Sequence, residues 1–318
     1  MTRVACGTVL LMLGGCSTSA ASAIADGGGR GDGTDAGLTA DVGADVSAEG
    51  DARRPSPAAI PPTTTFYWQI SGVIDPARAE AIYDVDLFDA APAGSSLLES
   101  DGTRVSIPLG RNPGIVGALH AKGKKVVCYV DTGAWENYRP DKDLFPPDVL
   151  GTTDVNWPLE RWLDIRPSSW PKFEGLILAR FDLAASLGCD AIEGDQNNSM
   201  GNNPGFPIGL ADEVAWYAEL AKQIHARGMG AIMKNGIELL SAPSAASTVA
   251  LYEAALNESC NQFSECGGYA SFVSAGKAVW NVEYTTASAT FCPPDTTANY
   301  DGYFANLALD GTTWNACR

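Results

Sequence analysis

One pattern of apolar and polar positions occurs four times along the chain: a glycine, a short apolar run, and then a polar or acidic residue. The four segments are Gly123–Asp131, Gly188–Asp195, Gly228–Asn235 and Gly276–Glu283. Each glycine follows a stretch that can form a helix. A helix, a glycine stop and a buried strand in alternation are typical of parallel α/β architecture. In a (β/α)8 barrel, the residues that end such strands lie on the rim that holds the active site.

The same pattern extends over most of the chain. Strands are expected over 65–71, 81–88, 125–131, 190–195, 230–235, 249–257 and 278–284. The clearest helices are expected over 112–122, 171–187 and 211–227. We expect loops over 90–111 and 132–170, and the second of these carries four tryptophans. Residues 285–318 must supply the eighth βα unit, although the pattern there is weak. The sequence therefore predicts an α/β fold, the (β/α)8 TIM barrel.

Two segments precede this domain. Residues 1–16 have one arginine, an apolar core and small residues before Cys16, which is typical of a secretory signal. The ending Leu13–Cys16 is similar to the lipobox of bacterial lipoproteins, in which the cysteine is acylated; an ordinary signal with an incidental cysteine is the alternative. Residues 17–60 contain almost no large apolar side chains and are expected to be a disordered linker. The 258 residues from 61 to 318 are close to the ~250 of one barrel.

The predicted destination of the chain follows from these segments. We expect an exported protein held by a lipid on Cys16, because the apolar run is too short to span a membrane as a helix. In some bacteria an aspartate directly after the lipidated cysteine signals retention in the inner membrane. This chain has Ser17 at that position, which favours the outer membrane, on its periplasmic or surface face. The membrane would then be a partner through this anchor alone.

The charge of the chain is strongly acidic. Of the formal net charge of −17, the signal contributes +1 and the linker −4, which leaves −14 on 61–318. Such a field repels nucleic acid and anionic polymers and attracts cations. General solubility outside the cytoplasm explains the charge equally well. The charge therefore argues against a nucleic-acid partner but identifies no function. We expect a monomer.

Six cysteines remain once Cys6 and Cys16 are set aside. An even number in an exported domain favours disulfides. Local spacing favours Cys260–Cys266, and Cys292–Cys317 would then hold the C-terminal tail. Cys128 and Cys189 lie on separate predicted core strands, where a third bridge and two buried thiols are equally expected.

Carboxylates gather at the predicted C-terminal ends of the strands. Glu193 and Asp195 are two positions apart, so they point to the same face of one strand. Acids inside an apolar barrel mouth are costly unless they are used or paired. A salt bridge or a helix cap would explain any one of them, but not easily the whole set. The polar strand ends are Asp131, Glu193, Asp195, Lys234, Asn235, Asn257, Glu258 and Glu283.

The rest of the composition narrows the chemistry. His120 and His225 both lie near helix ends that face away from the acids, which favours a structural role over a triad or zinc site. The chain has no nucleophile elbow, phosphate-binding loop or dinucleotide fingerprint. Glycoside hydrolysis needs two carboxyl groups, and sugar sites are lined by aromatic faces. The tryptophans of 132–170 could supply these faces, or could cap the barrel. We expect neither a cofactor nor a metal.

Several motifs in the same order resemble glycoside hydrolase family 114, the endo-α-1,4-polygalactosaminidase-like barrels. The resemblance covers roughly 66–284. It is carried by Trp68–Gly72, Tyr83–Asp89, Cys128–Val130, Gly133–Glu136, Trp162–Arg166, Arg180–Ala184, Glu193–Asp195, Asn257–Cys260 and Gly276–Tyr284. One departure is visible: Gly194 and Gln196 stand where the family usually has proline and asparagine. This change puts substrate preference in doubt more than activity.

The resemblance implies a catalytic pair, Asp195 as nucleophile or base and Glu258 as acid. It also implies a cationic amino-sugar polymer as the substrate, which an acidic domain suits. We expect the substrate-binding residues to be Trp68, Asp84, Asp86, Asp131, Trp135, Glu193, Lys234, Asn235, Glu283 and Tyr284.

The expected function is thus endo-acting hydrolysis of α-1,4-linked galactosamine-containing polysaccharide by paired carboxylates. Two alternatives stay open. One is a non-catalytic carbohydrate-binding surface lipoprotein, and the other is a hydrolase of the same fold that acts on a different polysaccharide. The sequence does not separate a retaining from an inverting mechanism.

Overall fold

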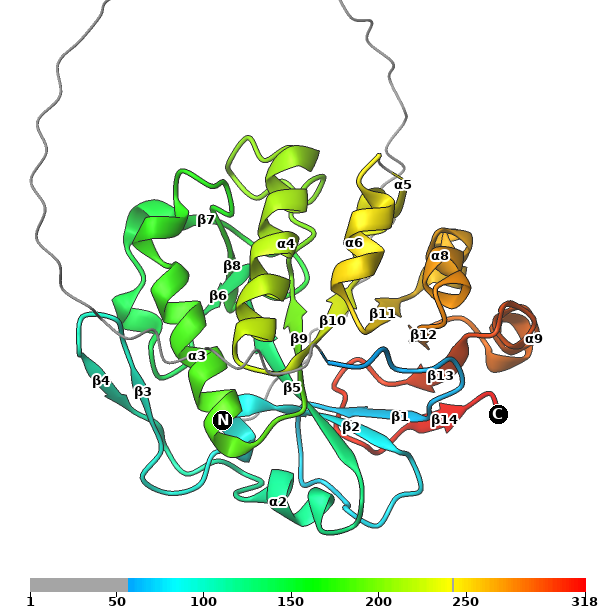
Figure 1. Ribbon diagram of the computed structural model, residues 1–318. Helices are drawn as coiled ribbons and strands as arrows, with labels where there is room; N and C mark the ends of the chain where they lie inside the picture. The colour runs from blue at the N-terminus through cyan, green and yellow to red at the C-terminus, as the bar shows by residue number, and fades with distance from the viewer. Residues whose placement is uncertain (1–56, 242) are drawn as a thin grey trace, which may run out of the picture. The chain divides into compact units, whose positions relative to one another are not determined.

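The computed structural model describes residues 57–241 and 243–318, and these form a barrel (Figure 1). Nine strands join in one sheet in the order β1-β2-β5-β9-β10-β11-β12-β13-β14. The first eight pair in parallel, whereas β14 pairs antiparallel with β13. They are β1 (Phe66–Gln69), β2 (Ile82–Asp86), β5 (Lys125–Asp131), β9 (Ala191–Asp195), β10 (Gly230–Lys234), β11 (Ala254–Glu258), β12 (Ala278–Glu283), β13 (Asp301–Ala305) and β14 (Trp314–Ala316). The (β/α)8 prediction is confirmed.

Side chains and a loop join the first and last parallel strands. The hydroxyl of Tyr303 on β13 accepts the Phe66 N–H of β1 at 2.9 Å. Beyond β1, the Ile70 and Ser71 N–H groups both donate to the Leu309 carbonyl, at 3.1 and 3.2 Å. Phe66 also stacks on Trp280 with 4.1 Å between ring centroids. Stacked aromatic rings therefore fill the seam of the barrel, where they add to burial.

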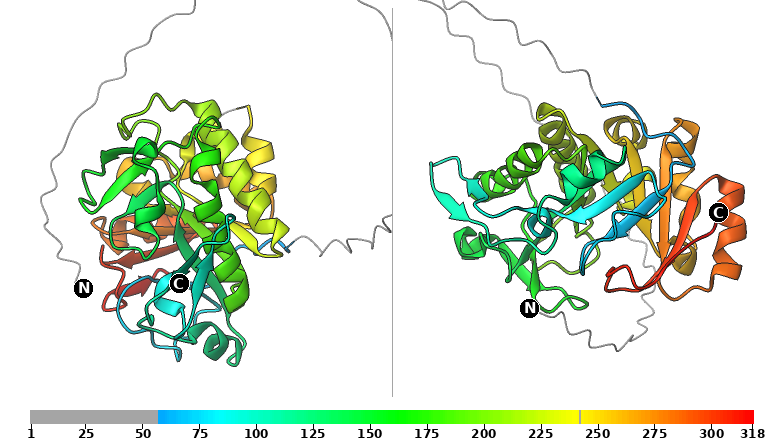
Figure 2. Two further views of the ribbon diagram at one scale, coloured as in Figure 1. Left: turned by 90° about the vertical axis from the view of Figure 1, so that its left-hand side faces the viewer. Right: turned by 90° about the horizontal axis from the view of Figure 1, so that it is seen from below.

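The helices pack on the outside of the strands, as two further views show (Figure 2). They are α1 (Leu87–Ala90), α2 (Ile115–His120), α3 (Glu174–Leu187), α4 (Leu210–Ala226), α5 (Ile237–Ser241), α6 (Ala245–Leu251), α7 (Cys260–Phe263), α8 (Ala270–Ser274) and α9 (Ser288–Ala298). Four single 3₁₀ turns are η1 (Lys142–Leu144), η2 (Pro147–Val149), η3 (Trp170–Lys172) and η4 (Cys266–Tyr269). α3 ends at Gly188, whose φ of 88° is left-handed and suits a glycine stop.

Three predicted strands were too long: the one expected over 65–71 covers only Phe66–Gln69, and two others are shortened by a neighbouring helix. The strand expected over 81–88 ends at Asp86, because the Asp86 carboxylate accepts the Asp89 N–H at 2.9 Å and begins α1. The strand expected over 249–257 begins only at Ala254, since the preceding residues up to Leu251 belong to α6. A continuous apolar run does not distinguish a buried strand from the end of a buried helix.

Both expected loops contain short antiparallel strands. Segment 90–111 includes the hairpin of β3 (Ser96–Leu98) and β4 (Arg104–Ser106). Segment 132–170 holds a three-stranded sheet in the order β6-β8-β7, with β6 (Ala134–Glu136), β7 (Leu150–Thr153) and β8 (Glu160–Leu163). Strands of three or four residues carry too little alternation to be predicted from the pattern.

The tail completes the barrel in an unexpected way. α9 leads into β13, the eighth parallel strand, but β14 follows β13 in place of a helix. The sequence signal of α9 was weak because the helix contains Pro293 and Pro294. The prediction that 285–318 supply the eighth strand is confirmed, and the prediction of a complete βα unit there was wrong.

Three disulfides connect the six cysteines of the domain. Cys260–Cys266 and Cys292–Cys317 confirm the expected pairs. Cys128–Cys189, 61 residues apart, settles the pair that the sequence left open. It joins β5 to the turn between α3 and β9, the strand that pairs with β5.

The N-terminal predictions lie mostly outside the described residues. The predicted signal, the predicted lipid attachment at Cys16 and residues 17–56 of the predicted linker fall on residues that the structure does not describe. Ile60, at the end of the predicted linker, accepts the Ala278 N–H at 2.7 Å and donates to the Glu253 carbonyl at 3.0 Å. Within 57–241 and 243–318, no helix is long and apolar enough to cross a membrane.

Candidate active site

The carboxyl ends of β9, β10 and β11 bring one lysine and three acids together. The Lys234 Nζ lies 2.7 Å from Asp195, 3.0 Å from Glu258 and 3.3 Å from Glu193. It also lies 4.6 Å from the centre of the Trp68 ring, which places Trp68 beside the ammonium as a cation–π partner. We call Lys234, Asp195, Glu258 and Glu193 the Lys234 cluster. Parallel strands end at one edge, which is why residues far apart in sequence meet here.

Burial divides the cluster into a floor and a mouth. The side chains of Lys234 and Glu193 are 1% and 0% exposed, whereas those of Asp195 and Glu258 are 17% and 28% exposed. Only the latter two can reach a substrate without rearrangement. Lys234 lies beneath them and attracts both carboxylates to one point.

Three donors converge on Asp195. Besides Lys234, the Tyr129 hydroxyl donates to Oδ2 at 3.0 Å and the Gln196 N–H donates to Oδ1 at 2.8 Å. Burial, and then the negative charge of Asp195, raises the pKa of Tyr129 well above its usual value, so the phenol stays protonated and donates. The carboxylate of Asp195 is thus fixed in direction on both oxygens.

Glu258 is fixed as firmly, and by different residues. The Tyr284 hydroxyl donates to Oε1, while the Asn235 amide and Lys234 approach Oε2 at 3.1 and 3.0 Å. Asn235 also accepts the Glu258 N–H at 2.9 Å, so one side chain holds both the backbone and the carboxylate of Glu258. Asn235 has a φ of 48°, a left-handed conformation that asparagine tolerates better than most residues.

Two buried acids inside the barrel carry raised pKa values. Burial raises the pKa of Glu193 to about 8, against the opposing effect of Lys234. Burial and then the Glu193 charge raise the pKa of Asp84 well above its usual value. Neither oxygen of either side chain accepts a hydrogen bond of good geometry from a described residue, although Glu193 forms an ion pair with Lys234 at 3.3 Å. Burial therefore favours the protonated form of both carboxyl groups.

Other predicted site residues brace the neighbouring loops. Arg139 donates to both oxygens of Asp86, at 3.0 and 2.7 Å. Asp131 is buried, and its Oδ1 accepts the Ala134 N–H at 2.7 Å. The Trp135 indole donates to the Lys142 carbonyl at 2.9 Å. Glu283 accepts the Asn261 N–H at 2.8 Å, next to the loop that follows Glu258. The structure therefore places these four residues around the cluster and not within it.

An arginine-centred group holds the segment that follows β5. Arg180 donates to both oxygens of Asp141, at 2.8 and 2.9 Å, and its Nη1 lies 3.6 Å from Glu136. Glu136 in turn accepts from Arg139 at 2.6 Å. We call this group the Arg180 network; its members are Arg139, Arg180, Asp86, Glu136 and Asp141.

Sequence reasoning missed two residues that contact Asp195, namely Tyr129 and Gln196. Tyr129 lies in the middle of an apolar strand, where an aromatic residue indicates core. Its contact with Asp195 depends on the pairing of β5 with β9, which sets Tyr129 opposite Glu193. Gln196 contributes its backbone N–H, and every residue type except proline has this group, so the sequence gives no signal for it. Tyr129 was within a motif of the family resemblance, and this was the one signal available.

The histidines lie at the other end of the barrel. His120 pairs with Asp190 at 2.8 Å and His225 with Glu253 at 3.1 Å, and these acids directly precede β9 and β11. The predicted structural role agrees with this placement. In the described ranges, 57–241 and 243–318, no three His, Cys, Asp or Glu residues are arranged to hold a metal ion.

Comparisons with known proteins agree with this geometry. The family model of glycoside-hydrolase family GH114 matches residues 47–318. A crystal structure of Aspergillus fumigatus Ega3 in complex with galactosamine is 27% identical, with a TM-score of 0.65 over 83% of this chain and 97% of that one. The glycoside hydrolase domain of Pseudomonas aeruginosa PelA is 13% identical, with a TM-score of 0.55 over 79% of this chain and 98% of that one, and supports the fold alone. A search of curated proteins found no match. Because the family model covers most of the sequence, the chain belongs to glycoside-hydrolase family GH114 and is a glycosidase.

Proposed function

We propose that this glycosidase cleaves α-1,4-linked galactosamine-containing polysaccharide within the chain, with Asp195 and Glu258 as its catalytic pair. The observation that carries the proposal is the partly exposed pair of carboxylates above the Lys234 ammonium. The Aspergillus fumigatus relative, which is complexed with galactosamine, supports an amino sugar as the substrate unit.

We assign Asp195 as the nucleophile and Glu258 as the acid, in a mechanism that retains the anomeric configuration. The two carboxylate oxygens lie 2.7 and 3.0 Å from the same Nζ, so their separation is below about 6 Å, nearer to the ~5–5.5 Å of retaining glycosidases than to the ~6.5–9.5 Å of inverting ones.

The assigned steps balance as follows. Asp195 attacks the anomeric carbon while Glu258 gives its proton to the departing glycosidic oxygen, and a covalent glycosyl-enzyme forms. Glu258 then takes a proton from a water molecule that attacks the same carbon, and Asp195 is released. Lys234, Tyr129 and Tyr284 hold the two carboxylates in place through both steps.

The substrate we propose is a cationic amino-sugar polymer. Its ammonium groups complement the −14 charge of residues 61–318. Added salt should then weaken binding of a partly deacetylated chain more than that of a fully acetylated one. Equal cleavage of both polymers, with no effect of salt, would remove this part of the proposal.

We also propose that the protein is exported and held by a lipid on Cys16. The three disulfides support an oxidising compartment. Expression with metabolic labelling by a fatty acid tests the anchor, and Cys16→Ser should abolish the label. A labelled Cys16→Ser variant would contradict the assignment.

The experiment that tests the activity is product analysis of residues 57–318 on galactosaminogalactan, beside Asp195→Asn and Glu258→Gln. Release of oligosaccharides by the parent and not by the variants would support the hydrolase and the pair. Proton NMR of the first products would show the α-anomer if the mechanism is retaining. If the parent binds the polymer but releases no oligosaccharides, the protein is a carbohydrate-binding protein. If the parent neither binds nor cleaves the polymer, its substrate is a different polysaccharide.

A further inference from the structure

The chain turns abruptly straight after Glu258. β11 ends at Glu258, Ser259 has a left-handed φ of 60°, and α7 begins at Cys260. α7 has four residues and ends against Ser264, which is left-handed again with a φ of 61°. A helix this short is not stable through its own hydrogen bonds, and two non-glycine residues in this conformation are strained. Other contacts must therefore keep the turn in place.

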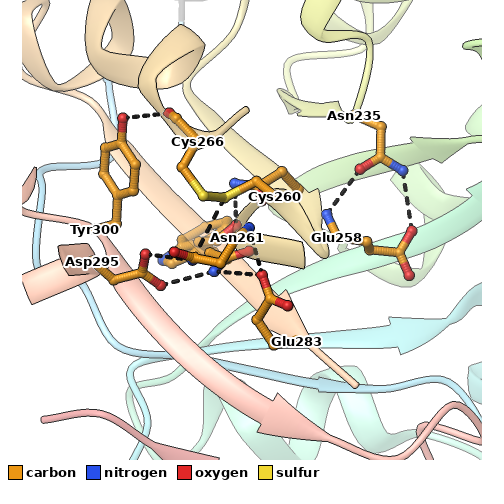
Figure 3. The surroundings of a disulfide bond; sticks show 11 residues. Asn235, Glu258, Cys260, Asn261, Cys266, Glu283, Asp295 and Tyr300 are labelled. Carbon is orange, nitrogen blue, oxygen red and sulfur yellow. Dashed lines mark hydrogen bonds between the residues drawn. A yellow bond between two sulfur atoms is a disulfide. The ribbon is translucent and has the colours of Figure 1, made fainter. Parts of the chain in front are cut away.

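Those contacts come from a disulfide and from three polar side chains (Figure 3). Cys260–Cys266 closes the turn on itself, and Tyr300 donates to the Cys266 carbonyl at 2.9 Å. The Asn261 N–H donates to Glu283 at 2.8 Å, and the Asn261 amide donates to Asp295 at 2.8 Å. Asn281 holds the other oxygen of Asp295 at 2.8 Å. The turn is thus anchored to β12 and α9.

The turn is mechanically linked to Glu258 from two sides. Ser259, between Glu258 and Cys260, donates its N–H to the Val282 carbonyl at 2.8 Å. Glu283, which holds Asn261, directly precedes Tyr284, and the Tyr284 hydroxyl donates to the Glu258 carboxylate. Without the Cys260–Cys266 bond, only the hydrogen bonds would hold Ser259 in its left-handed conformation. A relaxation of Ser259 would rotate the end of β11 and move the carboxylate.

We propose that Cys260 and Cys266 are positioning residues, and that their disulfide holds Glu258 at the distance from Asp195 that catalysis requires. The proposal rests on the proposed function, in which Glu258 is the acid. The bond closes a short loop, with a sequence separation of 6, so it constrains the unfolded chain less than a long-range bond does. Its main contribution is to activity.

Cys292–Cys317 provides a matched control. It joins α9 to the tail, with a sequence separation of 25, and neither cysteine adjoins Glu258. Cys260→Ala/Cys266→Ala and Cys292→Ala/Cys317→Ala each remove one disulfide and leave no odd thiol. Since the longer loop restricts the unfolded chain more, we expect the control variant to lose more in melting temperature.

The loss of activity should be larger in Cys260→Ala/Cys266→Ala than in the control variant, the reverse of the order expected for melting temperature. On galactosaminogalactan, Cys260→Ala/Cys266→Ala should lose about tenfold or more in kcat at nearly constant KM, because small misplacement of a catalytic group is costly. The control variant should keep kcat within about twofold, since it leaves the reacting groups in place. A kcat equal to that of the parent, or an equal loss in both variants, would overturn the proposal.

A second substrate separates misplacement of the acid from loss of folded enzyme. A galactosaminide oligomer with a 2,4-dinitrophenyl leaving group needs no proton from Glu258. Cys260→Ala/Cys266→Ala should release the first equivalent of dinitrophenol within about threefold of the parent rate, because formation of the glycosyl-enzyme then needs no acid, whereas its hydrolysis still needs Glu258 as base. An equal loss on both substrates would overturn the proposal. A parent enzyme that releases nothing from either substrate would instead remove the proposed function.

A second pair of variants tests the same turn without touching the cysteines, in case the double variant does not fold. Glu283→Gln keeps an oxygen that accepts the Asn261 N–H, whereas Glu283→Ala does not. We expect Glu283→Gln to retain polymer kcat and Glu283→Ala to lose it while still cleaving the dinitrophenyl substrate. Equal polymer kcat for the two variants would contradict the link between the turn and Glu258.

Discussion

The Lys234 cluster and the Arg180 network contain the same kinds of group but differ in how well those groups are matched. In the Arg180 network every carboxylate oxygen accepts from a donor, and two guanidinium groups serve three acids. In the Lys234 cluster one ammonium serves three acids, and the oxygens of Glu193 lack hydrogen-bond partners among the described residues. The side chains of the Arg180 network are buried, whereas those of Asp195 and Glu258 are partly exposed to solvent.

The difference shows which acids are structural. A bidentate arginine–carboxylate pair has little left to offer a substrate, and its removal leaves a buried charge. Asp195 and Glu258 also accept donors on both oxygens, but they share one ammonium and are partly exposed, so a substrate can contact them. Solvent exposure of acids that share one cation, more than the number of acids, therefore marks the reactive end of the barrel.

The largest effect should come from neutralising the exposed pair. We expect Asp195→Asn and Glu258→Gln each to lower kcat on the polymer by about 10³-fold or more, since each removes a group that takes part in bond breaking. The free energy of unfolding should stay the same or rise, because each change leaves one fewer carboxyl group to share the Lys234 ammonium. Single-turnover assays and denaturant titration measure the two quantities. A stable variant with parental kcat would exclude that residue from the pair.

Replacing the central cation of each group tests directly whether the Arg180 network is structural and the Lys234 cluster is catalytic. Arg180→Met leaves Asp141 buried and unpaired, so it should cost about 3–5 kcal/mol in unfolding free energy while the remaining folded enzyme keeps its kcat. Lys234→Met should cost less stability, because Asp195 and Glu258 can hydrate, but should lower kcat by about 10²-fold through loss of their shared anchor. Urea titration beside kcat tests both. Equal stability losses would mean that both groups are structural.

The architecture and the edge that carries the site could be predicted because both depend on local pattern. Gly188 and Gly228 mark helix ends, and Asp195 follows a buried strand in the sequence itself. Parallel pairing then requires Asp195, Lys234 and Glu258 to end near one another. No knowledge of side-chain direction was needed for this step.

The pairing of individual side chains could not be predicted, because it depends on contacts between distant segments. Asp86 reads as a rim acid, but Arg139, 53 residues later, occupies both of its oxygens. Tyr129 reads as core until the register of β5 and β9 is known. The Cys128–Cys189 bond likewise spans 61 residues, over which spacing carries no signal. The sequence therefore identifies where acids gather, and the tertiary contacts decide which stay reactive.

A smaller effect should come from replacing Asn235, a neutral partner of Glu258, with an acidic residue. Asp at position 235 would still accept the Glu258 N–H and tolerate the left-handed backbone, but it would place a second carboxylate 3.1 Å from Oε2. A like charge favours the protonated acid, so Asn235→Asp should move the basic limb of the kcat/KM profile up by about one pH unit. Asn235→Ala, which adds no charge, serves as the control. Coincident profiles for the parent and Asn235→Asp would contradict Glu258 as the acid.

The smallest effect at any one pH step concerns stability and Glu193, the buried acid of the Lys234 cluster. Burial raises the pKa of Glu193 to about 8, whereas an unfolded glutamate titrates near ~4.3. Between these values the folded chain keeps a proton that the unfolded chain has released. The free energy of unfolding therefore falls as pH rises, by up to about 1.4 kcal/mol per pH unit, and levels off above the folded pKa.

Glu193→Gln has nearly the same size and cannot ionise, so its unfolding free energy should decline less steeply than that of the parent between about pH 5 and pH 8. Glu219→Gln is the matched control, because pairing lowers the pKa of Glu219 and its titration lies below this range. Denaturant midpoints across pH measure the slopes. Equal slopes for Glu193→Gln and the parent would mean that Glu193 is ionised in the folded protein. The Lys234 cluster would then be as fully charged as the Arg180 network, and the protonated floor that distinguishes the two regions would not exist.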